Sequence, residues 1–270
     1  MDTPDVFAGV ATHVVFAGGP PPTPAEKSVL LGRLTATTVT RSVAADSGIE
    51  LADALGVGAP PGPGSAGGPP LAAVLGDMDS VDPARLARAE REGIPVERFP
   101  SDKDATDLEL ALDDAVAHAS PGDRLVVVGT TSGRFDHVLA TLLVLASPAY
   151  DDVDREAWLG GEVVHVVRGA RSLELGEGTT FSVLPLHGDA RGVTARGVRW
   201  ELHGEVLAAG TSRGVSNVAA RAVVDIEVAR GTVLVVVPSA QDAPRGASPP
   251  DAPHAHQRAA GEIDDTEEAR

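Results

Sequence analysis

The sequence predicts an N-terminal, mainly parallel α/β sandwich domain followed by a C-terminal all-β sandwich domain. Between residues 13 and 146, short apolar runs alternate with amphipathic segments, which is the pattern of β-α units around a parallel sheet. After Ser147 the apolar segments are short, β-branched and separated by glycine-containing turns, and no long helical period appears. A chain of 270 residues is long enough for two domains, each with its own core.

Five short apolar runs in the first half are expected to be strands. They are residues 13–17, 42–45, 71–75, 95–99 and 125–128. Their length and spacing match strands that alternate with helices.

Three segments between or after these strands carry helix signals. Asp82 can cap a helix that has Pro83 at its first position. Thr106 and Glu109 have the spacing of a capping box at the start of a second helix. Residues 134–145 place four apolar side chains on one face of a third helix.

The second half contains six candidate strands of a sandwich or a barrel. They are residues 163–168, 172–175, 179–186, 193–200, 223–229 and 232–237. Together with composition, they predict a flexible N-terminus at 1–12, an α/β domain at 13–150, a β-sandwich domain at 160–238 and a disordered tail at 239–270. Residues 59–70 are mostly proline and glycine and are expected to form a flexible insertion.

Composition excludes several classes of function. The formal net charge of −17 repels nucleic acid and anionic membranes, so neither is an expected partner. If a protein this acidic handles an anionic nucleotide, it has to screen the repulsion locally, and a divalent cation is the usual means. The absence of cysteine excludes disulfides and thiolate chemistry, and no apolar run has the length of a membrane span. We therefore expect a cytoplasmic protein.

Acidic or glycine-rich clusters follow four of the predicted strands, where open α/β sheets bind their ligands. The clusters are residues 45–48, 76–80, 102–107 and 129–137. Asp77 and Asp79 can both point at one cation from a turn, although such pairs also arise as solvated turn residues. Asp107 suits a helix start on its own, but Asp102 and Asp104 beside it favour a cation site.

The fourth cluster has the composition of a phosphate-binding turn. Gly129 and Gly133 let backbone N–H groups approach a phosphate, and Arg134 at a helix start can bind phosphate with two hydrogen bonds. Such turns are also common without a ligand. The chain contains no P-loop motif, so it is not expected to be a P-loop enzyme.

Taken in order, these clusters resemble the motifs of the thiamine pyrophosphokinase family. The matching segments are Asp46-Ser47-Gly48, Gly76-Asp77-Met78-Asp79-Ser80, Lys103-Asp104-Ala105-Thr106-Asp107, the run 129–137, and Gly197 to Leu202 followed by Ser216-Asn217. The resemblance spans about residues 13 to 237. Ser47 and Ser132 stand where that family usually has glycine, and Val218 stands where its bacterial members often have an acidic residue.

The resemblance implies a two-domain homodimer with active sites between its subunits. It implies Mg²⁺ as the metal, ATP as co-substrate and thiamine as acceptor. The residues it implies are Asp77, Asp79 and Asp107 for Mg²⁺; Asp46, Lys103, Thr106, Gly133, Arg134 and Asp136 around ATP and the reacting phosphates; and Trp200, Ser216 and Asn217 for thiamine. An aromatic wall suits cationic thiamine, although Trp200 is equally compatible with a place in the core.

The implied reaction is attack of the thiamine hydroxyl on the β-phosphorus of ATP, with AMP as leaving group. Such a transfer depends mainly on positioning and charge stabilisation. Asp104 and Asp136 are alternative acceptors of the hydroxyl proton. The rival hypotheses are a glycosyltransferase with a DxD metal site, a pyrophosphokinase for another hydroxymethyl acceptor such as a pterin, and a non-catalytic nucleotide-binding relative.

Overall fold

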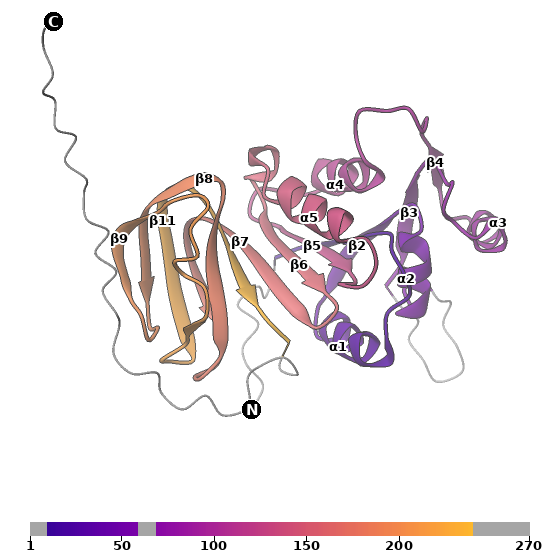
Figure 1. Ribbon diagram of the computed structural model, residues 1–270. Coiled ribbons are helices and arrows are strands. Elements are labelled where there is room, and N and C mark those ends of the chain that lie inside the picture. Colours follow the sequence, from indigo (N-terminus) through magenta and orange to yellow (C-terminus); the bar gives the residue numbers. More distant parts are fainter. Residues whose placement is uncertain (1–9, 59–68, 240–270) are drawn as a thin grey trace, which may run out of the picture.

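The computed structural model describes residues 10–58 and 69–239 (Figure 1). The expectations of a flexible N-terminus, a flexible insertion and a disordered tail fall mainly on residues 1–9, 59–68 and 240–270, which lie outside the described residues. Among the described helices, none is both long and apolar enough to cross a membrane.

A parallel sheet forms the N-terminal half, in the order β6-β5-β1-β2-β3-β4. Its strands are β1 (Thr12–Phe16), β2 (Val39–Ala45), β3 (Leu71–Gly76), β4 (Val96–Arg98), β5 (Arg124–Gly129) and β6 (Asp154–Leu159). The five predicted strands are confirmed as elements, and only their ends differ. All parallel strands place their carboxyl ends at the same edge, so the segments that follow β2 and β3 meet there.

Helices cover both faces of the parallel sheet, so alternate strand residues belong to different cores. They are α1 (Pro24–Thr35), α2 (Gly48–Ala54), α3 (Pro83–Arg91), α4 (Asp107–Ala117) and α5 (Phe135–Leu145), followed by a 3₁₀ turn at Pro148–Tyr150. In β1, Val15 packs with residues of α4 and α5, whereas Val14 and Phe16 pack with residues of α1, α2 and α3. This two-sided burial explains why these strands are continuously apolar.

The three predicted helices begin close to where their signals lie. Asp82 accepts a hydrogen bond from the backbone N–H of Ala84 at 2.9 Å, and Thr106 accepts one from Glu109 at 3.2 Å. Helices α1 and α2 were not predicted. For α1 a signal exists, because Thr23 and Glu26 form a complete capping box.

Strand β6 was also missed, because two of its buried residues are charged. Arg155 and Glu156 have exposed fractions of only 3% and 2%. Ion pairs compensate their burial: Arg155 pairs with Asp151 at 2.8 Å, and Glu156 pairs with several cationic groups. A search for apolar runs cannot find such a strand.

The C-terminal half is an antiparallel, sandwich-like sheet around a core of its own, as the sequence predicts. Its strands are β7 (Glu162–Glu174), β8 (Thr180–Arg196), β9 (Leu202–Leu207), β10 (Asn217–Val218) and β11 (Val223–Val237). Strands β7, β8 and β11 are long because each joins two predicted strands. Register shifts in β11 at Val228/Val233 and Arg230/Thr232 mark where two short strands were expected.

Two differences from prediction matter for the site. The expected strand at 193–200 ends at Arg196, so Trp200 lies in the connection between β8 and β9. The two halves also share one hydrogen-bonded sheet, because β6 pairs with β5 on one side and with β7 on the other. The α/β half and the C-terminal strands therefore lie side by side along this sheet (Figure 1).

Candidate functional site

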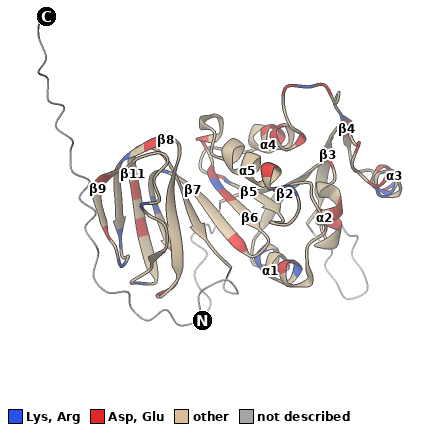
Figure 2. Cartoon of the chain, viewed as in Figure 1, with Lys and Arg blue, Asp and Glu red and all other residues tan. Residues whose placement is uncertain are grey.

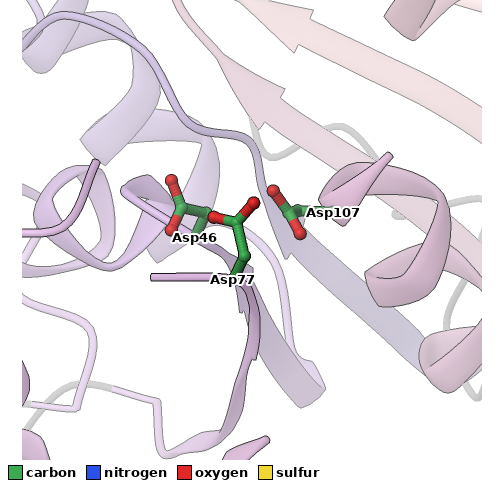
Figure 3. Close-up of side chains that lie close together, drawn as sticks. All are labelled: Asp46, Asp77 and Asp107. Atoms are coloured by element: carbon green, nitrogen blue, oxygen red, sulfur yellow. The ribbon is translucent and has the colours of Figure 1, made fainter. Parts of the chain in front are cut away.

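Three carboxylates meet at the carboxyl edge of the parallel sheet (Figure 3). Asp46 follows β2, Asp77 follows β3, and Asp107 is the first residue of α4. Each offers an oxygen, and these oxygens all lie within 4.8 Å of one another. We call these three residues the acidic triad.

Gly76 allows the triad to form. A Cβ atom at this position would lie 3.0 Å from Cβ of Asp46 and 3.1 Å from Cγ and Oδ1 of Asp107. Its φ of +153° is also a conformation that side chains disfavour. Any larger residue would therefore push the carboxylates of Asp46 and Asp107 apart.

Asp46 is held in an unusual conformation. Its φ is +46°, which is uncommon for a residue other than glycine and often marks a functional site. One carboxylate oxygen, Oδ2, accepts a hydrogen bond from the Ser80 hydroxyl. The other, Oδ1, is buried and has no hydrogen-bond partner among the described residues. A buried carboxylate oxygen without a donor is suited to a cation.

Lys103 partly offsets the charge of the triad. Its Nζ lies 2.9 Å from Oδ1 of Asp107 and 3.7 Å from Oδ2 of Asp77, and the close contact with the Asp107 carboxylate is the main reason that the pKa of Lys103 is raised. The pKa of Asp77 is lowered, chiefly because it accepts a hydrogen bond from the backbone N–H of Asp79. Asp77 therefore stays ionised at neutral pH.

Asp79 lies beside the triad but outside the group of oxygens within 4.8 Å. Its side chain is exposed, and its pKa is raised first by the charge of Asp77 and further by Asp46 and Asp107. The structure therefore brings Asp46, rather than Asp79, together with Asp77 and Asp107. Asp104 is exposed in the loop before α4, and Thr106 caps that helix.

The donor set of the triad fits a divalent cation with oxygen ligands. In the octahedral shell of Mg²⁺, adjacent oxygens lie about 3 Å apart and opposite oxygens about 4 Å apart, since each metal–oxygen bond is about 2.0 to 2.1 Å. The triad approaches that spacing, and three carboxylates served by one lysine leave excess negative charge at one point. Acidic side chains are also spread over both halves of the molecule (Figure 2), so negative charge alone does not define the site.

The glycine-rich turn between β5 and α5 carries a second group of predicted residues. Gly133 has a φ of +95° and packs against Pro20, where a Cβ atom would come within 2.9 Å of Cδ. Arg134 precedes α5 and forms an exposed ion pair with Asp136 at 2.6 Å. Within the described part of the chain, these two side chains bind each other rather than the acidic triad.

The residues predicted to bind thiamine lie in the C-terminal half, in β10 and in the connections beside its strands. Trp200 is 43% exposed, so the alternative that it belongs to the core is wrong, and Arg199 stacks over its ring at 4.9 Å. Asn217 is buried and exchanges hydrogen bonds with the backbone of Trp200, at 3.2 Å to its N–H and 2.9 Å to its carbonyl. Ser216 is exposed with a φ of +60°. Asn217 therefore fixes the position of Trp200.

The acidic triad and Trp200 lie toward opposite ends of the sheet. In the strand order β10-β8-β11-β7-β6-β5-β1-β2-β3-β4, the triad lies at β2 and β3, and Asn217 is in β10 (Figure 1). The structure therefore separates the two groups of predicted residues within one chain.

Sequence reasoning missed two contributors to the acidic site. Ser80 is not among the predicted site residues, although its hydroxyl donates a hydrogen bond to the Asp46 carboxylate. Asp46 was placed near ATP and not among the metal ligands, because nothing local shows that the segments after β2 and β3 converge. The only available signal was that both follow strands of one parallel sheet.

Comparisons with known proteins find matches to both halves of the chain. Residues 35–155 match a family model described as thiamin pyrophosphokinase, catalytic domain, and residues 165–233 match one described as thiamin pyrophosphokinase, vitamin B1 binding domain. A thiamine pyrophosphokinase of Bacillus subtilis (strain 168) is 25% identical over 164 residues, which are 60% of this chain and 76% of that protein.

Solved structures share the fold. The crystal structure of thiamine pyrophosphokinase from Bacillus subtilis has a TM-score of 0.67 at 21% identity, and covers 85% of this chain and 99% of its own. Thiamin pyrophosphokinase from Candida albicans has a TM-score of 0.64 at 12% identity, and the match covers 87% of this chain and 91% of that protein's chain. Both similarities extend through the parallel and the antiparallel parts of the sheet.

Proposed function

Because the chain belongs to the thiamine pyrophosphokinase family, we propose that it transfers the diphosphate of ATP to the hydroxyl of thiamine, giving thiamine diphosphate and AMP. The observation that carries this proposal is the acidic triad at the carboxyl edge of the sheet, inside the region matched by the catalytic-domain model. We assign residues 13–150 to ATP and metal and residues 160–238 to thiamine, a division supported by the matches of residues 35–155 and 165–233 to the two family models.

Mg²⁺ is the proposed metal. Asp77, Asp107 and Asp46 would hold it, with Asp79 beside them in the same electrostatic field. When bound, Mg²⁺ would screen the charge of the diphosphate and orient it for in-line transfer. Hard oxygen ligands and a site that takes only a few carboxylates are what this ion prefers.

The chain's own residues would position the phosphates. Lys103 would turn from the triad carboxylates to the incoming phosphate, and Arg134 offers a guanidinium at the start of α5. Thr106 keeps Asp107 in place by capping α4. Asp104 and Asp136 are both candidate acceptors of the hydroxyl proton, and the pKa of Asp136 is lowered chiefly by its hydrogen bond from Arg134.

We further propose a homodimer whose active site combines both halves of the sheet from different subunits. The separation of the acidic triad from Trp200 supports this arrangement, since one chain alone does not bring them together. A second copy can place its thiamine residues over the metal edge of the first. Neither nucleic acid nor membrane is a proposed partner, because of the charge of −17, and the proposed location is the cytoplasm.

An apolar stripe on α5 also supports the dimer. Phe135, Leu139 and Leu143 have exposed fractions of 75%, 45% and 39%, and their spacing of four residues places them on one helix face. Exposed apolar residues that line up in this way are typical of an interface. The stripe starts next to Arg134, so an interface here would border the proposed phosphate site.

The double variant Leu139→Glu, Leu143→Glu is expected to be a monomer, because two charges would be buried in an apolar interface. Sedimentation velocity at micromolar concentration measures this change. Ala84→Glu, on an exposed face at the start of α3, is the control and should remain dimeric. If the double variant sediments like the unmodified protein, α5 is not the interface.

The proposed reaction is tested by AMP formation from Mg·ATP with and without thiamine. We expect AMP to appear only with thiamine and in equal amount to thiamine diphosphate. With a hydroxymethylpterin in place of thiamine we expect no AMP, because residues 165–233 match a vitamin B1 binding domain. Absence of thiamine-dependent AMP would contradict the proposal and favour a non-catalytic role. A glycosyltransferase would release no AMP from ATP, with or without thiamine.

A further inference from the structure

A cavity of about 320 Å³ lies away from both proposed substrate sites. Its walls include the C-terminal end of α1 and parts of β5, β6 and β7. Arg124, the first residue of β5, lines it, so the cavity opens near the amino ends of the parallel strands. The acidic triad lies at their carboxyl ends. Catalysis as proposed above therefore does not use this cavity.

A buried carboxylate organises the polar wall of the cavity. Glu156 is 2% exposed, and four different side chains contact it. Its Oε1 accepts a hydrogen bond from Arg171 at 2.9 Å and lies 2.8 Å from Nδ1 of His165, with which it is hydrogen-bonded. Its Oε2 accepts hydrogen bonds from Nε1 of Trp158, at 3.1 Å, and from Arg124. Because these donors saturate both oxygens, Glu156 has little capacity left to bind a ligand's donors.

The remaining polar capacity of the wall is that of donors. Arg33 donates hydrogen bonds to the backbone carbonyls of Gly161 and Glu162, both at 3.1 Å. These bonds use two of its five N–H groups, and both acceptors are uncharged. Burial lowers the pKa of Arg33, and the charge of Glu156 opposes this effect only in part. Glu174 also lines the cavity but is exposed, where solvent screens its charge.

Apart from Thr37, the rest of the wall is apolar. Val163, Leu175 and Val237 line the cavity together with the indole of Trp158, which is almost fully buried. We infer that this cavity binds a small organic anion, a carboxylate on a short apolar or aromatic body, with the carboxylate on Arg33. The apolar body would lie against Trp158, and the volume suits a ligand of about ten heavy atoms at the lower end of the usual pocket size.

Tryptophan fluorescence provides a direct test, because the chain has only two tryptophans, Trp158 and Trp200. In the Trp200→Phe variant, Trp158 is the only indole. Benzoate is the probe, and benzyl alcohol is its uncharged counterpart. We expect benzoate to change the Trp158 emission with a saturable dependence and benzyl alcohol to bind at least about tenfold more weakly, since it lacks the charge-assisted hydrogen bonds.

Three further substitutions in that background locate the binding. Arg33→Gln should weaken benzoate binding by about tenfold or more. Ala36→Phe fills the cavity from the exposed end of α1 and should abolish the saturable signal without altering the buried network. Arg98→Gln, which removes an exposed arginine on β4, is the matched control and should leave the midpoint unchanged.

The circular dichroism spectrum and thermal midpoint of each variant are measured first. If Arg33→Gln does not fold, Ala36→Phe decides the outcome by itself. A linear, non-saturable response to benzoate would overturn the inference. So would equal midpoints for benzoate in the Ala36→Phe and Arg98→Gln variants.

Discussion

The Asp77→Asn variant is expected to form AMP from Mg·ATP and thiamine about 100- to 1,000-fold more slowly than the unmodified chain, because charge stabilisation by a bound metal is worth several kcal/mol in such transfers. Asp77 is a member of the acidic triad and stays ionised, since its pKa is lowered. Asparagine keeps the shape of the side chain but removes its charge. The measurement is the initial rate over a range of Mg²⁺ concentrations.

The matched control is Asp152→Asn, which changes an exposed carboxylate in the turn before β6, remote from the triad. Its rate should equal that of the unmodified chain. High Mg²⁺ should restore part of the activity of Asp77→Asn if the defect is metal affinity. Unchanged rate and unchanged Mg²⁺ dependence in Asp77→Asn would remove the triad from the mechanism.

A second large effect is expected for stability. Glu156→Gln should lower the free energy of unfolding at pH 7 by about 3 to 5 kcal/mol, because removing one member of a buried charge network leaves its partners uncompensated. The partners are Arg124, Arg171 and His165, all in contact with the buried carboxylate. Urea unfolding followed by circular dichroism measures the difference.

The effect of Glu156 should depend on pH with a definite sign. Burial raises the pKa of Glu156, but His165, Arg124 and Arg171 lower it more, so the net pKa lies well below its usual range. A lowered folded-state pKa stabilises the fold above the unfolded value of about 4.3, and this stabilisation is lost as pH falls through the folded-state pKa. The difference between Glu156→Gln and the unmodified chain should therefore be full above about pH 5 and shrink below it.

Glu97→Gln serves as the control for both measurements, because Glu97 is exposed on β4. Its effect should stay within about 0.5 kcal/mol. A loss of stability in Glu156→Gln no larger than this, or one that grows on acidification, would show that the network does not stabilise the fold as argued.

Local patterns predicted much of the molecule. The runs at 71–75 and 125–128 became β3 and β5, because strands buried on both faces need continuous apolar residues. Asp82 and Thr106 cap the helices they were expected to cap. The motif around Asp77 also pointed to the correct edge of the sheet, because residues that follow parallel strands share that edge.

Other features depend on contacts between residues far apart in the sequence. Strand β6 escaped prediction because Arg155 and Glu156 are buried only by virtue of partners elsewhere in the chain. The exposure of Trp200 follows from where β8 ends, at Arg196, which pairing with β11 and β9 decides. Neither fact is visible in a window of ten residues.

By itself, the sequence determined the fold class, the helix starts and the chemistry available after each strand, because propensity, capping and periodicity act over a few residues. Only the tertiary structure decided that Asp46 joins Asp77 and Asp107, and that the residues predicted to bind thiamine lie toward the other end of the same sheet. Strand order and register arise from long-range pairing and burial, and these are properties of the whole chain rather than of any segment.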